Sequence, residues 1–136
     1  MIHRRALLPL LLGSWLLAAC PVARPKSVDC GSVKNQIELT EKQLHGFAAI
    51  DPKTATSEQL TSWASALSAA QKSFAPTDTL VHDDVKQAVN QYKTALDALS
   101  AAVGDRAAGK GSPEAVIAAR AALAAGQTLV DERCAK

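Results

Sequence analysis

The chain has 136 residues, the length of one ordinary domain; 48% of them are apolar and 21% are charged. This balance excludes an intrinsically disordered chain, and an aromatic content of 4% argues against a β-sandwich. Alanine supplies 27 positions, which favours helix. The net charge of +2 comes from Arg4 and Arg5, so the rest of the chain is close to neutral. A strongly basic surface is absent, and we expect no nucleic-acid partner.

Residues 1–19 have the layout of a secretion signal. A short basic start is followed by an apolar run over 6–17 and then by two alanines. The run is shorter than the roughly 20 residues that a membrane span needs, and Pro9 and Gly13 interrupt it. We therefore expect residues 1–19 to be a signal peptide that is removed on maturation.

The junction Leu17-Ala18-Ala19-Cys20 resembles the lipobox of bacterial lipoproteins. This resemblance covers residues 1–20 only. It implies that the Cys20 thiol receives a diacylglyceryl group, that the chain is cut before Cys20, and that the new amine is acylated. Several acyl chains make a stable anchor, because each buried methylene contributes about 0.8 kcal/mol. The alternative is an ordinary signal peptide that leaves Cys20 as a free thiol.

The same resemblance implies a location in the bacterial cell envelope. Pro21, rather than aspartate, follows the cysteine. By resemblance to enteric lipoproteins, this permits transport to the outer membrane of a Gram-negative cell; in other bacteria the anchor holds the protein on the outer face of the cytoplasmic membrane. Residues 20–29 are expected to be the lipidated cysteine and an extended tether, because they hold two prolines and no periodic apolar pattern.

The remaining residues, 30–136, show the pattern of a helical domain. Apolar residues recur at alternating steps of three and four, which is typical of helices packed on other helices. The four stripes that follow this pattern cover residues 30–47, 60–74, 81–103 and 116–134.

Local signals mark where these helices begin and end. Thr56 and Gln59 fit a capping box for the second helix, and Asp78 is the expected N-cap of the third. Ser112 and Pro113 fit the start of the fourth. Because the connections are short, we predict an all-α, up-down-up-down four-helix bundle.

Cys30 and Cys134 lie on the first and last stripes, near the two ends of the domain. In an up-down-up-down bundle these two ends meet, and an exported chain encounters an oxidising compartment. We therefore predict a disulfide that joins the terminal helices and contributes up to about 4.7 kcal/mol to stability on the chain-entropy model. The alternative is a metal site in which His82 joins the two thiolates.

Other chemical motifs receive simpler interpretations. His45 and His82 are expected at opposite ends of the bundle, and Met1 is lost with the leader, so we expect no haem or metal cofactor. The segment 104–112 resembles a phosphate-binding loop but has Gly111 where serine or threonine should follow Lys110; we interpret it as the turn between two helices. No nucleophile with a neighbouring base is indicated, and we expect no enzymatic activity.

The exposed faces of the second and fourth helices carry few charges. Surfaces poor in lysine and glutamate are typical of interface cores, so Ser65, Ala121 and Ala125 mark a candidate contact face for an unidentified protein. The leading hypothesis is therefore a lipid-anchored interaction or structural module. The alternatives are an inhibitor or immunity protein of an envelope enzyme, and a carrier of a small ligand held near four aromatic side chains: Phe47, Trp63, Phe74 and Tyr92.

Overall fold

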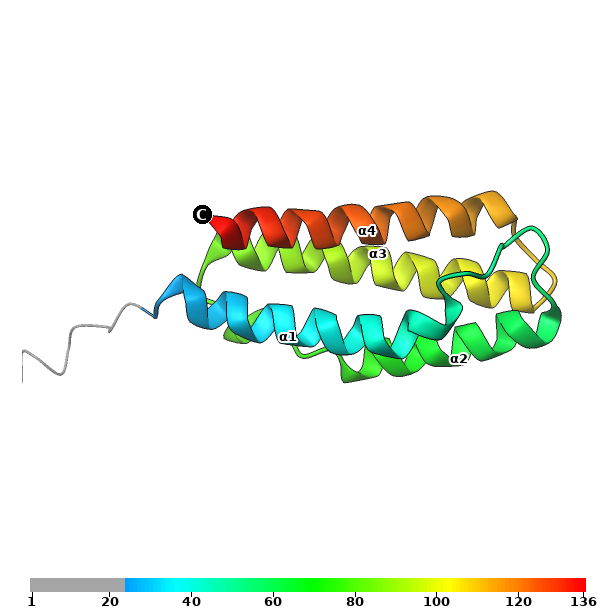
Figure 1. The fold of residues 1–136 in the computed structure, drawn as a ribbon, viewed down its shortest axis with the longest axis horizontal. Helices are drawn as coiled ribbons and strands as arrows, with labels where there is room; N and C mark the ends of the chain where they lie inside the picture. The colour runs from blue at the N-terminus through cyan, green and yellow to red at the C-terminus, as the bar shows by residue number, and fades with distance from the viewer. Residues whose placement is uncertain (1–23) are drawn as a thin grey trace, which may run out of the picture.

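The computed structural model describes residues 24–136, which are all-helical with no strand. The described residues form four long helices, which lie side by side, with the start of α1 and the C-terminus at the same end of the molecule (Figure 1). Two short 3-10 helices, η1 and η2, follow α1 and α2. The elements are α1 Lys26–Leu44, η1 His45–Phe47, α2 Ser57–Ser73, η2 Thr77–Thr79, α3 Asp83–Ala107 and α4 Pro113–Ala135. The predicted all-α class with four packed helices is confirmed.

The core lies where the four apolar stripes predict it. Helix α3 packs against α2 and α4, and α1 packs against α2 and α4. Among the described residues the most deeply buried large side chains come mainly from α3: Tyr92, Leu96, Leu99, Val85, Val89 and Val103, with Leu67 from α2 and Val116 and Val130 from α4. The one polar member of the first stripe, Thr40, is also buried, and its hydroxyl donates to the Gln36 carbonyl at 3.0 Å.

Helices α3 and α4 pack closely at Gly126. A Cβ atom at this position would lie 3.0 Å from the Tyr92 Cα and 3.3 Å from its backbone nitrogen. These distances are shorter than almost all Cβ contacts in real proteins, so the backbone of Tyr92 would have to shift. The glycine therefore lets the two helix backbones pack together, although glycine within a helix costs about 0.5–1 kcal/mol relative to alanine.

The predicted helix starts at Thr56 and Ser112 are confirmed. The Thr56 hydroxyl accepts from the Gln59 amide at 3.2 Å, and the Gln59 side chain accepts from the Thr56 amide at 2.9 Å, which completes the capping box. The Ser112 hydroxyl accepts from the Ala115 amide at 3.2 Å. Each contact satisfies an amide that has no partner within its own helix.

The segment that resembles a phosphate-binding loop in sequence forms the end of α3 and the turn between α3 and α4. Gly109 adopts a φ of 76°, and the Lys110 amide donates to the Asp105 carbonyl at 2.7 Å. This is a Schellman ending of α3, which requires a left-handed residue and therefore favours glycine. The interpretation as a turn is confirmed for residues 108–112, whereas residues 104–107 form the last turn of α3.

One sequence prediction near the chain entry is wrong. Helix α1 begins at Lys26, directly after Pro25, so residues 26–29 are helical rather than part of an extended tether. Apolar periodicity could not reveal this first turn, because polar contacts of Asp29 hold it in place. Residues 20–23 lie outside the described part of the chain.

Asp78 is not the N-cap of α3. It lies in η2, and α3 begins at Asp83 with His82 as its N-cap. Leu80, which precedes α3, packs into the core. Val81, which the pattern predicted as buried, remains 56% exposed. The segment just before α3 is held instead by Asp29 of α1, which accepts from the amides of Val81 and His82, a contact that no local pattern shows.

Candidate functional site

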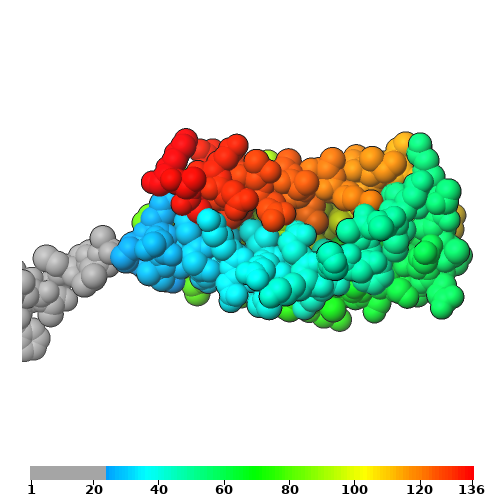
Figure 2. Space-filling model, in the orientation of Figure 1, coloured from blue at the N-terminus to red at the C-terminus, as the bar shows by residue number. Residues whose placement is uncertain are grey.

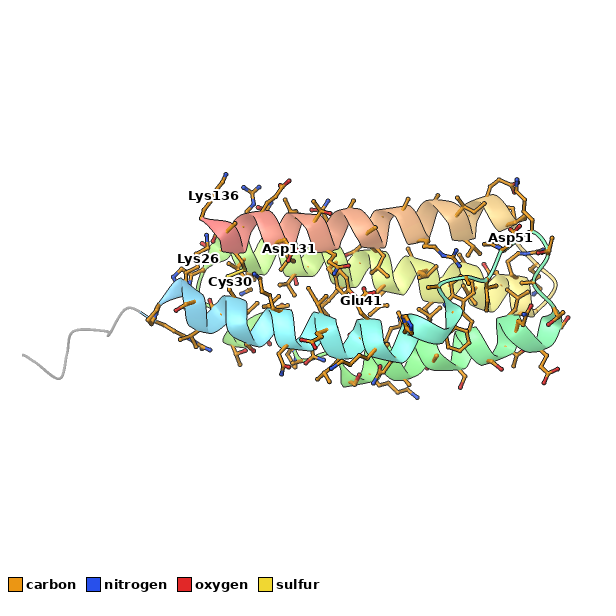
Figure 3. The ribbon with its side chains drawn as sticks, in the orientation of Figure 1. Lys26, Cys30, Glu41, Asp51, Asp131 and Lys136 are labelled. Carbon is orange, nitrogen blue, oxygen red and sulfur yellow. A yellow bond between two sulfur atoms is a disulfide. The ribbon has the colours of Figure 1, made fainter. Side chains whose placement is uncertain are left out.

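Cys30 and Cys134 form the predicted disulfide, with their Cα atoms 5.7 Å apart and 104 residues between them in sequence. Cys30 lies in the second turn of α1 and Cys134 in the last turn of α4. We call this end of the bundle the disulfide end; Cys30 is labelled there in Figure 3. Because both cysteines are bonded to each other, the alternative metal site is not formed.

A buried carboxylate, Asp29, organises the disulfide end. Its side chain is fully buried. The Oδ2 atom accepts hydrogen bonds from the amides of Val81 and His82, both at 3.0 Å, and lies 2.9 Å from the His82 Nδ1. The Oδ1 atom lies 3.2 Å from the Arg24 Nε. One carboxylate thus joins the first turn of α1, the segment before it and the start of α3.

These contacts stabilise the charged form of Asp29. Burial alone would raise its pKa, but the hydrogen bonds from the His82 side chain and from the amides of His82 and Val81, together with the charge of Arg24, lower the pKa below its usual value of 3.8. Nearby, the Lys26 ammonium donates to the Asp84 Oδ2 at 2.5 Å, and this hydrogen bond lowers the pKa of Asp84. The cluster leaves no pattern in the sequence, because Asp29 falls in the segment that was expected to be an extended tether.

The histidines lie at opposite ends of α1, as expected. His82 contacts Asp29 near the start of that helix, whereas His45 directly follows its last residue. In residues 24–136, no group of three or more histidine, cysteine, aspartate or glutamate side chains is placed to hold a metal ion.

The four aromatic side chains proposed for a ligand site form two separate pairs. Phe47 stacks on Trp63, with ring centroids 6.4 Å apart, while Phe74 packs against Tyr92 at 5.7 Å. The first pair lies near the end of α1 and the start of α2, far from the disulfide; we call this end the pocket end. A single site lined by all four residues is therefore not present.

A pocket of about 140 Å³ opens beside the Phe47–Trp63 pair. Side chains from every long helix line it: Glu41, Leu44, Phe47, Ala48, Trp63, Leu99, Arg120 and Leu123. A second hollow of about 270 Å³ between α1 and α4 shares Glu41 with it. Figure 2 shows the depression between these two helices, with α3 visible at its floor. We call the first of these two spaces the Trp63 pocket.

Arg120 covers one side of the Trp63 pocket. Its guanidinium carbon lies 4.6 Å from the centroid of the Trp63 ring, and its Nη2 donates to the Ile50 carbonyl at 3.0 Å. Burial lowers the pKa of Arg120, and the charge of Asp51 opposes that effect. The guanidinium stays charged, since the usual pKa of arginine is far above neutrality.

Glu41 lies on the side of α1 that faces α4 (Figure 3). Its Oε1 accepts a hydrogen bond from the Tyr92 hydroxyl at 3.2 Å. Burial, followed by the charge of Glu41 and this hydrogen bond, raises the pKa of Tyr92, so the phenol remains a donor. The sequence pattern indicated a role for Tyr92. It indicated none for Glu41 or Arg120, because each of these two residues is an isolated charge on its helix.

The candidate contact residues are all exposed. Ser65 lies on α2, whereas Ala121 and Ala125 lie on α4 one turn apart, next to Ile117, which is 43% exposed. Both helices pack against α3. The α4 positions form an exposed apolar strip, and Ser65 lies on a different helix.

Comparison with known proteins finds no family model, no curated protein and no solved structure that matches this chain. Within residues 24–136, no helix combines the length and the apolar character needed to cross a membrane. Cys20 and the preceding signal-like segment lie outside the described residues.

Proposed function

We propose that the protein is a non-catalytic module of the bacterial cell envelope, anchored to a membrane by lipid on Cys20. The Cys30–Cys134 disulfide is the observation that carries this proposal, because such bonds persist in oxidising compartments and are rare in the cytosol. The lipobox-like junction before Cys20 supplies the anchor. The membrane is the outer membrane of a Gram-negative cell, or otherwise the cytoplasmic membrane at its outer face.

We also infer that the helices alternate in direction, as an up-down-up-down bundle requires. The Gln36 side chain, near the middle of α1, donates to the Ser73 carbonyl at the end of α2. Asp29 joins the starts of α1 and α3. Near the start of α4, Arg120 reaches the segment that follows α1. All three contacts support the same order.

The geometry favours an upright bundle with its disulfide end at the bilayer. Six residue steps separate Cys20 from Lys26, so even an extended chain holds α1 within about 22 Å of the lipid. Helix α3, with 25 residues, is about 37 Å long. The pocket end would then point away from the membrane, toward partners or ligands in the surrounding compartment.

Metabolic labelling tests the anchor. Cells that express the full chain are fed a palmitate analogue, and the label is normalised to the amount of protein. We expect label on the natural chain, none on Cys20→Ala, and an unchanged label on the matched variant Cys134→Ala. Equal labelling of the Cys20→Ala variant would remove the lipid anchor from the proposal.

The protein-contact role of the α4 strip is tested by crosslinking. A photoreactive residue at position 121 is compared with one at position 98, because Ala98 is an exposed helical alanine on α3. We expect a discrete adduct in intact cells from position 121 only, and Ala125→Glu should abolish it while the helical content is retained. Identical adduct patterns from the two positions would contradict a contact face on α4.

A further inference from the structure

The Trp63 pocket combines apolar walls with two opposite charges. Leu44, Trp63, Leu99 and Leu123 are buried and supply the walls. Glu41 and Arg120 line the same space from α1 and α4. Among the ion pairs of the described residues, none joins Glu41 to Arg120. Each charge therefore faces the pocket without neutralising the other.

Both charged groups are held in place by partners of their own. The Tyr92 hydroxyl holds Glu41, and the Ile50 carbonyl with the Trp63 ring holds Arg120. A guanidinium has five N–H donors and a carboxylate has about four acceptor positions, so one hydrogen bond uses only part of either capacity. Side chains fixed in this way need little reordering when they bind a ligand, which favours affinity.

We propose that the Trp63 pocket binds a small zwitterion with a compact aliphatic body, the chemical class of the aliphatic α-amino acids. The ligand's ammonium would pair with Glu41 and its carboxylate with Arg120, while the aliphatic part contacts Trp63. An anion alone would face the Glu41 carboxylate, and a cation alone would face the Arg120 guanidinium. Only a ligand with both charges satisfies both groups in a partly desolvated site.

The size of the pocket fits this class. A volume of about 140 Å³ is close to the roughly 150 Å³ of an engineered protein cavity that admits benzene. A branched side chain of four carbons fits such a space, and the opening toward solvent leaves room for the two charged groups. This inference does not rest on the proposed function, because the pocket belongs to the bundle whether or not Cys20 carries lipid.

The fluorescence of Trp63 can report ligand binding in the pocket. Its two tryptophans are Trp15 and Trp63, so a full-length chain with Trp15→Phe emits tryptophan fluorescence only from the pocket. Three probes of similar shape are titrated: L-leucine, the acid 4-methylpentanoate and the amine 3-methylbutylamine. We expect L-leucine to bind at least about tenfold more tightly than either singly charged probe, with calorimetry as a second readout.

Two variants test the charge pairing. Glu41→Gln keeps an acceptor for the Tyr92 hydroxyl but removes the charge, and should reduce leucine affinity to that of 4-methylpentanoate. Glu38→Gln, one turn earlier on α1 and outside the pocket lining, should leave leucine affinity unchanged. Equal or tighter binding of either singly charged probe by the unsubstituted pocket would overturn the zwitterion assignment. Absence of binding by all three probes would overturn the site itself, without touching the anchor proposal.

Discussion

The two ends of the bundle are held together by different interactions. At the disulfide end, a covalent bond and a fully buried carboxylate tie α1 to α3 and α4. At the pocket end, Arg120 makes the polar contact between α4 and the segment after α1, and a pocket remains beside it. The disulfide end is therefore fixed by a covalent bond, while the pocket end combines a weaker connection with an accessible space.

This difference bears on how such a small domain divides its tasks. If Cys20 carries the proposed anchor, the first helix connects that anchor to the bundle, and cross-linking the helix near its start prevents it from separating from the bundle. A pocket, by contrast, needs space between helices, which lowers stability because the lining atoms lose contacts. With the two features at opposite ends, the cost of the pocket lies away from the proposed point of attachment.

The largest expected effect is loss of the disulfide. The double variant Cys30→Ala, Cys134→Ala should lower the free energy of unfolding by about 4–5 kcal/mol, because the bond closes a loop of about 100 residues in the unfolded chain. Urea unfolding measures this difference. Adding a reductant should destabilise the natural chain and leave the double variant unchanged; a loss below about 1 kcal/mol would show that the other contacts alone fix this end.

Replacing the buried carboxylate should have the next largest effect. Asp29→Asn keeps the size of the side chain but removes the charge that faces Arg24 and His82, and its NH2 group cannot accept a hydrogen bond where a carboxylate oxygen did. We expect a loss of about 3 kcal/mol in the free energy of unfolding. The exposed Asp97→Asn on α3 is a suitable control and should change stability by less than about 0.5 kcal/mol.

The lowered pKa of Asp29 predicts that the free energy of unfolding depends on pH. Because the folded state lowers the pKa of Asp29, its contribution is fully present above the unfolded value of 3.8 and is lost as the pH falls through the lower folded value. The difference between the natural chain and Asp29→Asn should therefore be constant from neutral pH down to about pH 5 and shrink below 3.8. Unfolding curves across this range measure it; a constant difference down to about pH 2 would contradict the stated cause.

A substitution at the contact between α3 and α4 should lower the free energy of unfolding more than one at the pocket end. Gly126→Ala places a methyl group 3.0 Å from the Tyr92 backbone, which cannot move aside without separating the helices. We expect a net loss of about 2 kcal/mol despite the better helix propensity of alanine. Gly104→Ala, also within a helix but with no atom within 4 Å of the new Cβ, should be neutral or stabilising. Thermal unfolding compares the two.

Much of this fold follows from local sequence signals, and the exceptions share a cause. Heptad-like stripes identified the core, and Thr56 and Ser112 marked helix starts through their own backbone neighbours. The start of α3 was misplaced because Asp29, which holds the amides of Val81 and His82 just before it, comes from about 50 residues earlier in the chain. A contact supplied by another helix leaves no local pattern.

The candidate site was harder to predict than the core. Sequence patterns selected the aromatic residues but could not sort them into the Phe47–Trp63 and Phe74–Tyr92 pairs, which depend on how the helices pack. Glu41 and Arg120 are each one charge among many, and only the packing of α1 and α4 brings them to one pocket. The disulfide was predictable because its cysteines lie at the two chain ends of the domain, where topology alone limits their positions.

The smallest effect on stability is expected at Arg120. Arg120→Gln removes the cation above Trp63 and weakens the hydrogen bond to Ile50, for a loss of about 1 kcal/mol. Lys93 lies above Phe74 at a longer 5.7 Å, and Lys93→Gln should cost less than about 0.5 kcal/mol. If Arg120→Gln instead destabilised the domain as strongly as Asp29→Asn, the pocket end would be as firmly held as the disulfide end. Arg120 would then be a structural connection between α4 and the Ile50 segment, with its guanidinium fully engaged in that role.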